Sequence, residues 1–264
     1  MTRSLYHGRT IREIPGSLAI VLAVLVALSG PSRAQIVNTL ESLDPEASGF
    51  DAVLDIALEA SGGNTETFDV AVTATLQWAS QRDRLRAILG YDLERADGTD
   101  NADDTFLHLR HNRAFGEVLN SLLFVQWQRN PFQRLRSRFL LGVGARFDLV
   151  RAEAVHLRLG TAHMVEIERI DGGTEVEDTD QRLSSFLDFA WRLPSGVTFS
   201  ANAFVQPRWD QPDDLRAIAS AGLEAPLGGG FALRTTVDAA YDSEPPDDVD
   251  ELDWDLATGL RFRY

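Results

Sequence analysis

Large apolar side chains recur at every second position through most of the chain from Phe50 to Tyr264, and polar or small residues fill the positions between them. Segment Phe68–Trp78 shows the pattern, with apolar residues at the even numbers and Asp69 and Gln77 among the odd ones. Successive side chains of an extended strand point to opposite faces, so a period of two predicts strands with one apolar face. Helical periodicity is hard to find in this region, which predicts an all-β fold.

Twelve such segments follow one another along the chain. They lie at about Phe50–Leu58, Phe68–Trp78, Leu85–Leu93, Thr105–Arg113, Val118–Gln128, Leu135–Asp148, Ala154–Val165, Gln181–Arg192, Val197–Gln206, Leu215–Ala225, Phe231–Tyr241 and Leu252–Tyr264. Most span about 9–12 residues, close to the roughly 9–11 that a tilted strand needs to cross a bilayer, whereas globular strands average about 5–6. The lengths favour a single transmembrane antiparallel β-barrel of about 12 strands over a soluble sandwich.

The connections between these segments alternate in length. The even-numbered ones are short: Ser80–Asp83, Ala114–Glu117, Leu193–Gly196 and Pro226–Gly230. The odd-numbered ones include four long stretches: Arg95–Asp104, Glu166–Asp180, Pro207–Asp214 and Asp242–Glu251. Tight periplasmic turns and longer outer loops are typical of outer-membrane barrels. An even strand number then places both termini on the periplasmic side.

The last segment keeps its alternation up to Tyr264, with Leu260, Phe262 and Tyr264 on one face. In a closed barrel the last strand pairs with the first, so its outward residues are held in the wall. A terminal aromatic residue with apolar residues at alternate preceding positions also resembles the signal that outer-membrane assembly machinery recognises. The expected partners of this face are that machinery and the lipid and lipopolysaccharide of the membrane.

The first 34 residues have the order of a secretory signal peptide. Arg3, Arg9 and Arg12 precede the apolar run Ser17–Gly30, and small residues lead to a plausible cleavage site after Ala34. This order predicts export, whereas an uncleaved membrane anchor is the alternative. The expected organisation is a signal peptide at 1–34, a short periplasmic segment at 35–49 and a barrel at 50–264, in the outer membrane of a Gram-negative bacterium.

The chain is strongly acidic, with a formal net charge of −15, no cysteine and arginine as its only basic residue besides histidine. Such a charge argues against nucleic-acid binding. Twenty of the 40 acidic residues lie in the four long connections. One interpretation is that acidic loops keep the protein well solvated and prevent aggregation by charge repulsion. The alternative is that these outer loops bind divalent cations, which prefer carboxylate oxygens.

Charged residues of both signs occupy the face opposite to the apolar one and are expected to line the lumen. They are Arg86, Asp92, Arg136, Arg138, Arg146, Arg158, Asp188, Arg216, Arg234, Asp238, Asp255, Arg261 and Arg263. One interpretation is a lumen tied together by arginine–carboxylate pairs, which form bidentate bonds in a confined polar space. The other is a selectivity lining along a narrow aqueous pore.

Catalytic chemistry finds little support in the sequence. Four histidines, His108, His111, His156 and His163, are the candidates for a base, with Ser185 or Asp188 as possible neighbours. No nucleophile elbow, zinc-binding helix or phosphate loop is present. We therefore predict no enzyme activity, cofactor or specific metal site. The alternatives are a lipid-modifying outer-membrane enzyme and a soluble exported β-barrel that binds an apolar ligand.

The stretch HLRHNRAFGEVLNSLLFVQWQRNPFQRLRSRFLLGVGARF (His108–Phe147) resembles the central part of the YdiY-like family, also called domain of unknown function 481. The matching residues are Gln126, Asn130, Phe132, Leu135, Arg138, Gly142, Gly144 and Arg146. The resemblance extends more weakly from about Asp55 to Tyr264. It implies an outer-membrane location and a barrel architecture rather than an activity, and the family's induction by salt hints at a role in envelope stress.

Overall fold

The predicted alternation forms a continuous antiparallel sheet in the computed structural model, which describes residues 48–61, 67–96, 99–130, 135–170, 176–245 and 251–264. The predicted signal peptide at 1–34 and most of the segment at 35–49 lie outside the described residues. The twelve strands are β1 (Gly49–Ser61), β2 (Thr67–Ala79), β3 (Asp83–Ala96), β4 (Thr99–Arg113), β5 (Leu119–Asn130), β6 (Leu135–Arg151), β7 (Val155–Ile170), β8 (Val176–Arg192), β9 (Thr198–Pro207), β10 (Leu215–Gly228), β11 (Phe231–Asp242) and β12 (Leu252–Arg263).

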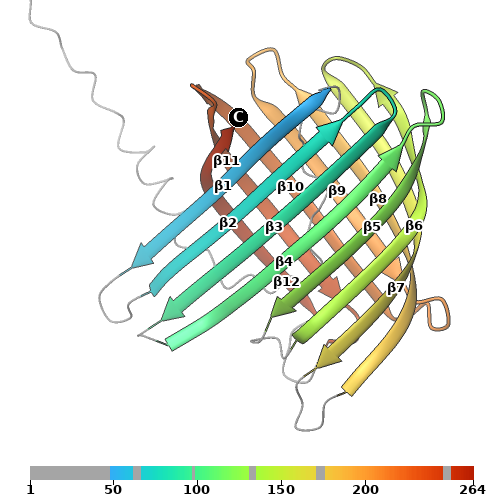
Figure 1. The fold of residues 1–264 in the computed structure, drawn as a ribbon. Coiled ribbons are helices and arrows are strands. Elements are labelled where there is room, and N and C mark those ends of the chain that lie inside the picture. Colours follow the sequence, from blue (N-terminus) through green and yellow to red (C-terminus); the bar gives the residue numbers. More distant parts are fainter. Residues whose placement is uncertain (1–47, 62–66, 97–98, 131–134, 171–175, 246–250) are drawn as a thin grey trace, which may run out of the picture.

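The sheet closes on itself, because β1 pairs with both β2 and β12 (Figure 1). The closing ladder is short and runs from Val53↔Arg263 to Ile56↔Leu260. Beyond it, the backbone of Tyr264 and that of Ala52 exchange two hydrogen bonds of 3.0 and 3.3 Å. The predicted all-β closed antiparallel barrel of 12 strands is confirmed.

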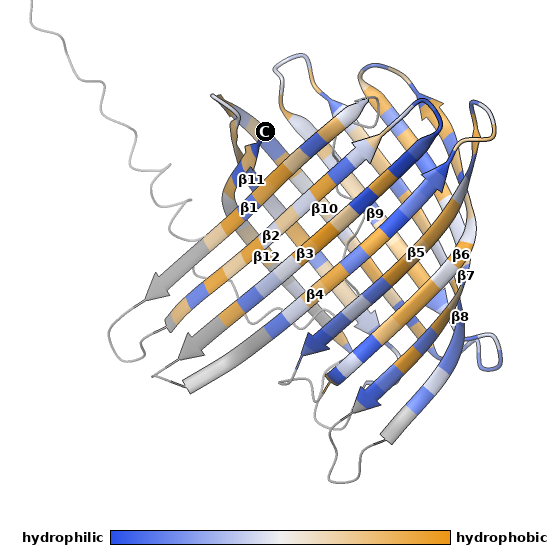
Figure 2. Cartoon of the chain, in the orientation of Figure 1, coloured by the Kyte–Doolittle hydropathy of each residue, from blue (hydrophilic) through white to orange (hydrophobic). Residues whose placement is uncertain are grey.

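Side chains alternate between the two faces of the barrel wall. Along β5 the outward Leu123 and Val125 are exposed, whereas the inward Leu122, Phe124 and Gln126 are buried. Apolar residues therefore recur along the strands, as the hydropathy colouring in Figure 2 shows, and those with exposed side chains lie on the outer surface. The alternation of faces that the period of two predicts is thus present in β5, and β4 follows the same rule, with its outward leucines exposed.

The predicted loop lengths are partly wrong. β3 continues to Ala96 and β4 begins at Thr99, so the expected loop Arg95–Asp104 is almost entirely strand. The connection between β7 and β8 is likewise reduced to residues 171–175. Backbone pairing does not require apolar side chains, so the ladders run on through acidic segments whose residues break the alternation. These acidic segments lengthen the barrel wall instead of forming loops.

The two ends of the barrel still differ. We call the end that carries the connections 208–214 and 243–251 the loop end, and the opposite end, with 80–82, 152–154 and 229–230, the turn end. The turn end is at the top of Figure 1, where the C-terminus also lies. Among the described residues, no helix has the length and apolarity needed to cross a membrane.

Candidate functional site

The interior of the barrel carries most of its buried polar side chains, which makes the lumen the candidate functional site. Along strands β6, β7 and β8 the inward residues change in character from the loop end to the turn end. On β7, for example, Glu166 comes first, then Met164 and Ala162, and finally Arg158. A layer of apolar residues therefore separates two charged regions.

The charged region at the loop end is organised by Glu166, whose side chain is buried. Its carboxylate binds Arg138 at 2.8 Å and Arg182 at 2.9 Å, and it also contacts Arg216. Around it, ion pairs of up to 3.8 Å link four arginines and five buried or half-buried carboxylates, which we call the Glu166 network: Arg138, Arg182, Arg208 and Arg216 with Glu166, Glu168, Asp180, Asp214 and Asp242. The attraction between these paired ions offsets much of the free-energy cost of removing them from water.

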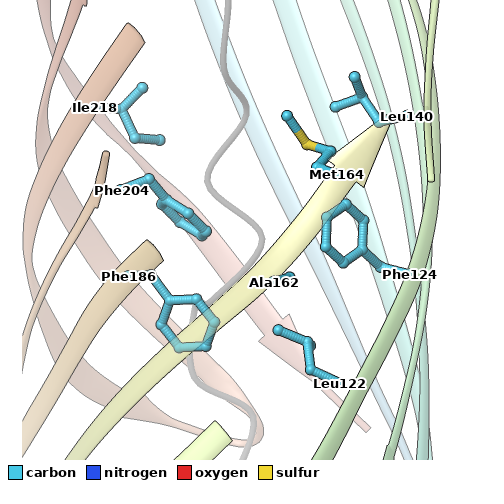
Figure 3. Packing of buried hydrophobic residues seen from close by; sticks show 8 residues of the cluster. All are labelled: Leu122, Phe124, Leu140, Ala162, Met164, Phe186, Phe204 and Ile218. Atoms are coloured by element: carbon cyan, nitrogen blue, oxygen red, sulfur yellow. The ribbon is translucent and has the colours of Figure 1, made fainter. Parts of the chain in front are cut away.

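The middle layer is apolar and comes from strands β5–β10. It consists of Leu122, Phe124, Leu140, Ala162, Met164, Phe186, Phe204 and Ile218, which we call the apolar layer (Figure 3). Between this layer, the Glu166 network and the imidazole of His108 lies a cavity of about 20 Å³, room for about one water molecule. On this side of the lumen the apolar layer leaves little space for solute.

Two glycines make the apolar layer possible. Gly142 pairs with Phe124, and Gly160 pairs with Phe186, on neighbouring strands. A Cβ atom at either glycine would meet ring atoms of its phenylalanine at 2.2 Å. Each ring therefore lies across the glycine opposite, as in the covering of strand glycines by aromatic residues. The first glycine of the GVGAR stretch thus makes room for a neighbouring side chain.

The charged region at the turn end is rich in arginine. We define the arginine layer as the inward-facing Arg84, Arg86, Arg110, Arg146 and Arg158, together with the two aspartates Asp148 and Asp188. Asp148 binds Arg146 at 2.9 Å and the peripheral Arg151 at 2.6 Å, while Asp188 binds Arg158 at 3.0 Å. Arg86 donates to the side-chain oxygen of Gln77 at 2.9 Å. This layer holds more guanidinium groups than carboxylates.

A smaller cluster crosses the inside of the β1–β12 closure. Arg261 donates to both carboxylate oxygens of Asp55, at 2.7 and 2.8 Å, and to Glu224 at 2.6 Å. The fork of its guanidinium matches the paired oxygens of Asp55, which makes the contact bidentate. Side-chain ion pairs thus bridge the seam where β1 and β12 share the fewest backbone partners.

The lumen is filled unevenly around its circumference. Most inward side chains of β5–β10 are buried. On the opposite strands some inward side chains, such as Ile88 and Gln77, are also buried. A set of small inward residues there keeps solvent-accessible surface, and we call this set the open wall: Ala57, Ala71, Thr73, Gly90, Ala257 and Gly259. Ala57 pairs with Ala71, and Thr73 pairs with Gly90, so the small residues are contiguous across β1, β2 and β3.

The structure brings most of the predicted lumen charges into these clusters. Arg86, Arg146, Arg158 and Asp188 belong to the arginine layer, Arg138 and Arg216 belong to the Glu166 network, and Arg234, Arg261 and Arg263 lie near Asp55 and Glu224. The inward position Asp92 is exposed and Asp238 is half-buried, on the less filled side. The side chain of Asp255 lies outside the described part of the structure.

The predicted lumen position of Arg136 is wrong. Leu135 pairs with Ile170 and Ser137 with Arg169, so Arg136 is the extra residue of a bulge in β6. A bulge breaks the strict alternation of faces at one position. Arg136 is exposed as a result, whereas Arg138 resumes the inward positions and is buried.

Several lumen residues escape the sequence analysis. Arg110 is one of them. Leu107 and Leu109 lie two positions apart and so share the outer face of the strand, which could have indicated that Arg110 points inward. Glu166 and Arg182 escape it because the acidic residues around them break the apolar alternation and indicate a loop. The apolar layer cannot be predicted from the sequence, because Leu122–Val125 is a continuous apolar run and both faces of that strand carry apolar residues.

The histidines do not form a common site. His108 is buried inside the lumen between the rings of Phe106 and Phe124, and its Nδ1 atom lies 3.1 Å from the side-chain oxygen of Gln126. His163 is exposed on the outer face, with ring centroids 6.0 Å apart between it and a tryptophan of the connection 208–214. Among the described residues, no three histidine or acidic side chains are arranged to hold a metal ion.

The architecture and the sequence agree on the family. Residues 54–264 match the family model described as "Protein of unknown function, DUF481". The chain belongs to the DUF481 family. The family predicted from the His108–Phe147 stretch is thus confirmed. A search of curated proteins gives no significant match.

Solved structures show that this DUF481 barrel has the fold of outer-membrane barrels. The porin NanC superposes with a TM-score of 0.52 at 8% identity, covering 80% of this chain and 98% of the porin. For the translocator domain of the autotransporter NalP from Neisseria meningitidis the TM-score is 0.51 at 11% identity, with 82% and 89% covered. An outer membrane channel from Pseudomonas putida F1 gives 0.51 at 11%, with 87% and 99% covered. At such identities the likeness concerns the fold alone.

Proposed function

We propose that this DUF481 protein is an outer-membrane barrel with a narrow water-filled path through its lumen. The observation that carries the proposal is the open wall, where small inward residues of β1, β2, β3 and β12 keep accessible surface opposite the filled half. Ala257 is exposed although it belongs to the inward set of β12. A strip of small polar and apolar side chains beside charged clusters is the kind of lining that admits small hydrated solutes.

The outer surface supports the membrane location. Every strand carries at least one large apolar residue that is exposed on this surface, among them Leu54 and Ile56 on β1 and Leu260 on β12. Ile56 pairs with Leu260, so the apolar surface continues across the seam. Soluble monomers rarely expose an apolar surface that continues around the molecule.

Aromatic residues near both ends of the strands support the same location. Trp78 and Trp191 are exposed near the turn end, and Tyr91 and Trp254 are exposed toward the loop end. Aromatic rings gather at the two membrane–water interfaces, where membrane barrels carry girdles of them. The distance between the two groups of rings is spanned by the apolar outer face of the strands.

Conductance in planar bilayers tests the proposed path. The wild-type protein should give discrete single-channel steps, and Ala257→Trp should lower the conductance on the order of twofold or more, because the indole would occupy the path. Ala219→Trp is the matched control, since Ala219 is exposed on the outer face of β10 and the same ring would meet lipid there. A silent wild-type protein would instead favour a structural barrel that is closed by the Glu166 network and the apolar layer.

We also propose that the loop end faces the outside and that both termini are periplasmic. The chain has no cysteine, so a single introduced thiol can report its side of the membrane. Asp210→Cys, in the connection 208–214, should react with a bulky membrane-impermeant maleimide on intact cells. Ser195→Cys, in the turn between β8 and β9, should react only after the outer membrane is permeabilised. The reverse pattern would invert the orientation.

The proposed partners at the loop end follow from this orientation. Lipopolysaccharide would surround this end, where Asp210 and Asp213 are exposed, and divalent cations would bridge its phosphates to such carboxylates. Equilibrium dialysis with Ca²⁺ in detergent tests the cation binding. The absence of a saturable Ca²⁺ site would contradict the proposed cation binding at the loop end.

The proposed contact with the assembly machinery is the outer face of the seam. Leu260 and Tyr264 are exposed there. Phe262 lies between them and packs on Phe231, with ring centroids 4.9 Å apart. These residues keep the alternating apolar pattern that the sequence predicts for an assembly signal. We propose no catalytic role.

A further inference from the structure

The seam between β1 and β12 is paired over only part of its length. β1 pairs with β2 up to its last residue, Ser61, and β12 pairs with β11 from its first residue onward. Along the described backbone, the ladder between β1 and β12 nevertheless ends toward the loop end at Ile56↔Leu260. Beyond this pair, each of the two described strands is paired on one side only. We call these facing edges, residues 57–61 and 255–259, the unpaired seam.

The backbone of both edges directs hydrogen-bonding groups toward the unpaired seam. In an antiparallel pair, every second residue points its N–H and C=O toward the same neighbour. Ala52 points them toward β12, since it exchanges two hydrogen bonds with Tyr264. The same alternation turns the backbone groups of Leu58 and Thr258 toward the unpaired seam. Such groups need a partner, because an unsatisfied backbone group costs free energy in hydrocarbon.

The unpaired seam lies at the depth of the apolar outer surface. On the outer face of β12 it is flanked by the exposed Trp254 toward the loop end and Leu260 toward the turn end. A strand crosses the hydrocarbon in about 9–11 residues, so a crossing that begins at Tyr264 ends near Trp254. In the membrane location that we propose, on which this inference rests, the seam is therefore unpaired within the hydrocarbon. Backbone of this kind persists there only where protein or the water of a cavity covers it.

The open wall lies directly inside the unpaired seam. A Cβ atom at Gly259 would lie 3.4 Å from that of Ala57, so the two strands still touch where the ladder ends. Nearer to the loop end, Ala257 is exposed on the inner face of β12 and Thr258 is exposed on its outer face. The edge of β12 is thus accessible from the lumen and from the membrane side.

We propose that the unpaired seam is a lateral binding site for a single-chain amphiphile, such as a fatty acid. Its polar head would lie against the open wall, where its oxygens accept hydrogen bonds from edge N–H groups such as that of Thr258. Its acyl chain would extend between β1 and β12 into the membrane and so remain in apolar surroundings. Binding at this site does not require conduction through the lumen.

A thin acyl chain fits this position better than a peptide strand does. Neighbouring strands lie about 4.8 Å apart, so a strand inserted between β1 and β12 would need the edges about 9–10 Å apart. The contact between Ala57 and Gly259 at the start of the unpaired seam argues against such a separation.

Photo-crosslinking in lipid vesicles tests the site, with a fatty acid that carries a diazirine in its chain as the probe. The probe should label the inward Ala57, and an excess of unmodified fatty acid should lower this labelling at least tenfold. Ala221 is the control, because it is exposed on the outer face of β10, where labelling from the membrane should not saturate. Labelling of Ala221 without saturable labelling of Ala57 would overturn the site and leave the membrane location intact.

A covalent bridge across the seam provides the second half of the test. The chain has no cysteine, so Glu59→Cys with Ala257→Cys introduces a single pair of thiols at positions that the register of the ladder places opposite each other. Bridging them with a bifunctional maleimide should lower the saturable labelling of Ala57 about tenfold. Thr236→Cys with Ala257→Cys is the matched control, since these residues pair between β11 and β12 and a bridge there leaves β1 unattached. Unchanged labelling after the first bridge would overturn the proposal.

Hydrogen exchange of the wild-type protein keeps the proposal testable should the bridged variant fail to fold. The amides of Leu58 and Thr258 should exchange at least tenfold faster than those of Leu54 and Ile56 in the closing ladder, and fatty acid should slow them in a saturable way. Slow exchange without added fatty acid, as a second copy or a peptide strand on these edges would give, would overturn the proposal.

Discussion

The two charged regions of the lumen use the same residue types but differ in their balance of charge. The Glu166 network joins four arginines to five carboxylates, whereas the arginine layer has five arginines and two carboxylates. Both sets include inward positions of β6, β7 and β8, which alternation treats alike. The difference teaches that alternation places charged residues in the lumen but does not determine how many opposite charges surround each of them.

Glu166→Gln should have the largest effect on this comparison. Glutamine keeps the shape of the side chain but removes the negative charge shared by Arg138, Arg182 and Arg216. Breaking a buried ion pair on one side costs about 3–5 kcal/mol, and with three arginines involved we expect about 5 kcal/mol of the free energy of unfolding. Urea unfolding in detergent measures it, with Asp210→Asn at the exposed rim as the control. A loss below about 1 kcal/mol, typical of surface pairs, would contradict the network's role.

Asp188→Asn makes the matching change in the arginine layer. It removes the carboxylate partner of Arg158, so we expect a loss of about 3 kcal/mol of the free energy of unfolding. Urea unfolding in detergent measures this loss beside that of Glu166→Gln. An equal loss in the two variants would show that the number of arginines paired with a carboxylate does not set the cost of removing its charge.

Much of the fold follows from alternation alone. The number of strands, their antiparallel order and the closure of the barrel are predictable, because most segments alternate in hydrophobicity and are long enough to cross a bilayer. The inward positions of Arg146 and Arg158 follow from the same rule. Their partners do not, since contacts such as Arg182 with Asp214 join residues far apart in the sequence and depend on the register of the ladders.

The failures have physical causes of the same kind. The sequence misplaces Arg136 because a bulge inserts one residue, and nothing in the local sequence marks it. The acidic segment Arg95–Asp104 resembles a loop because polar residues hide a strand whose backbone is paired. Leu122 and Phe124 are not recognisable as inward because their outward neighbours are equally apolar. Alternation therefore locates strands well but identifies the lining only where the two faces differ.

The layer between the two charged regions offers a smaller test. Gly142→Ala would place a Cβ atom 2.2 Å from ring atoms of Phe124, and the ring cannot move without disturbing the apolar layer. Overpacking of this kind costs about 1–3 kcal/mol. Gly116→Ala is the control, because a Cβ atom there meets nothing within 4 Å. Equal stability of the two variants in urea would show that the apolar layer adapts and does not hold the charged regions apart.

The smallest effect concerns Asp210, an exposed carboxylate outside the Glu166 network that pairs with Arg208 of the network. A hydrogen bond from Arg208 holds the pKa of Asp210 below its ordinary value. A carboxyl group with a lowered pKa stabilises the fold above its unfolded pKa, and this contribution disappears as the pH falls through the folded one. In ¹³C NMR spectra of the carboxyl carbons, assigned with Asp210→Asn, Asp210 should therefore titrate below the usual Asp value of about 3.9. Arg208→Gln should raise this midpoint toward the ordinary value, and a wild-type midpoint at or above that value would show that the pair does not persist in solution.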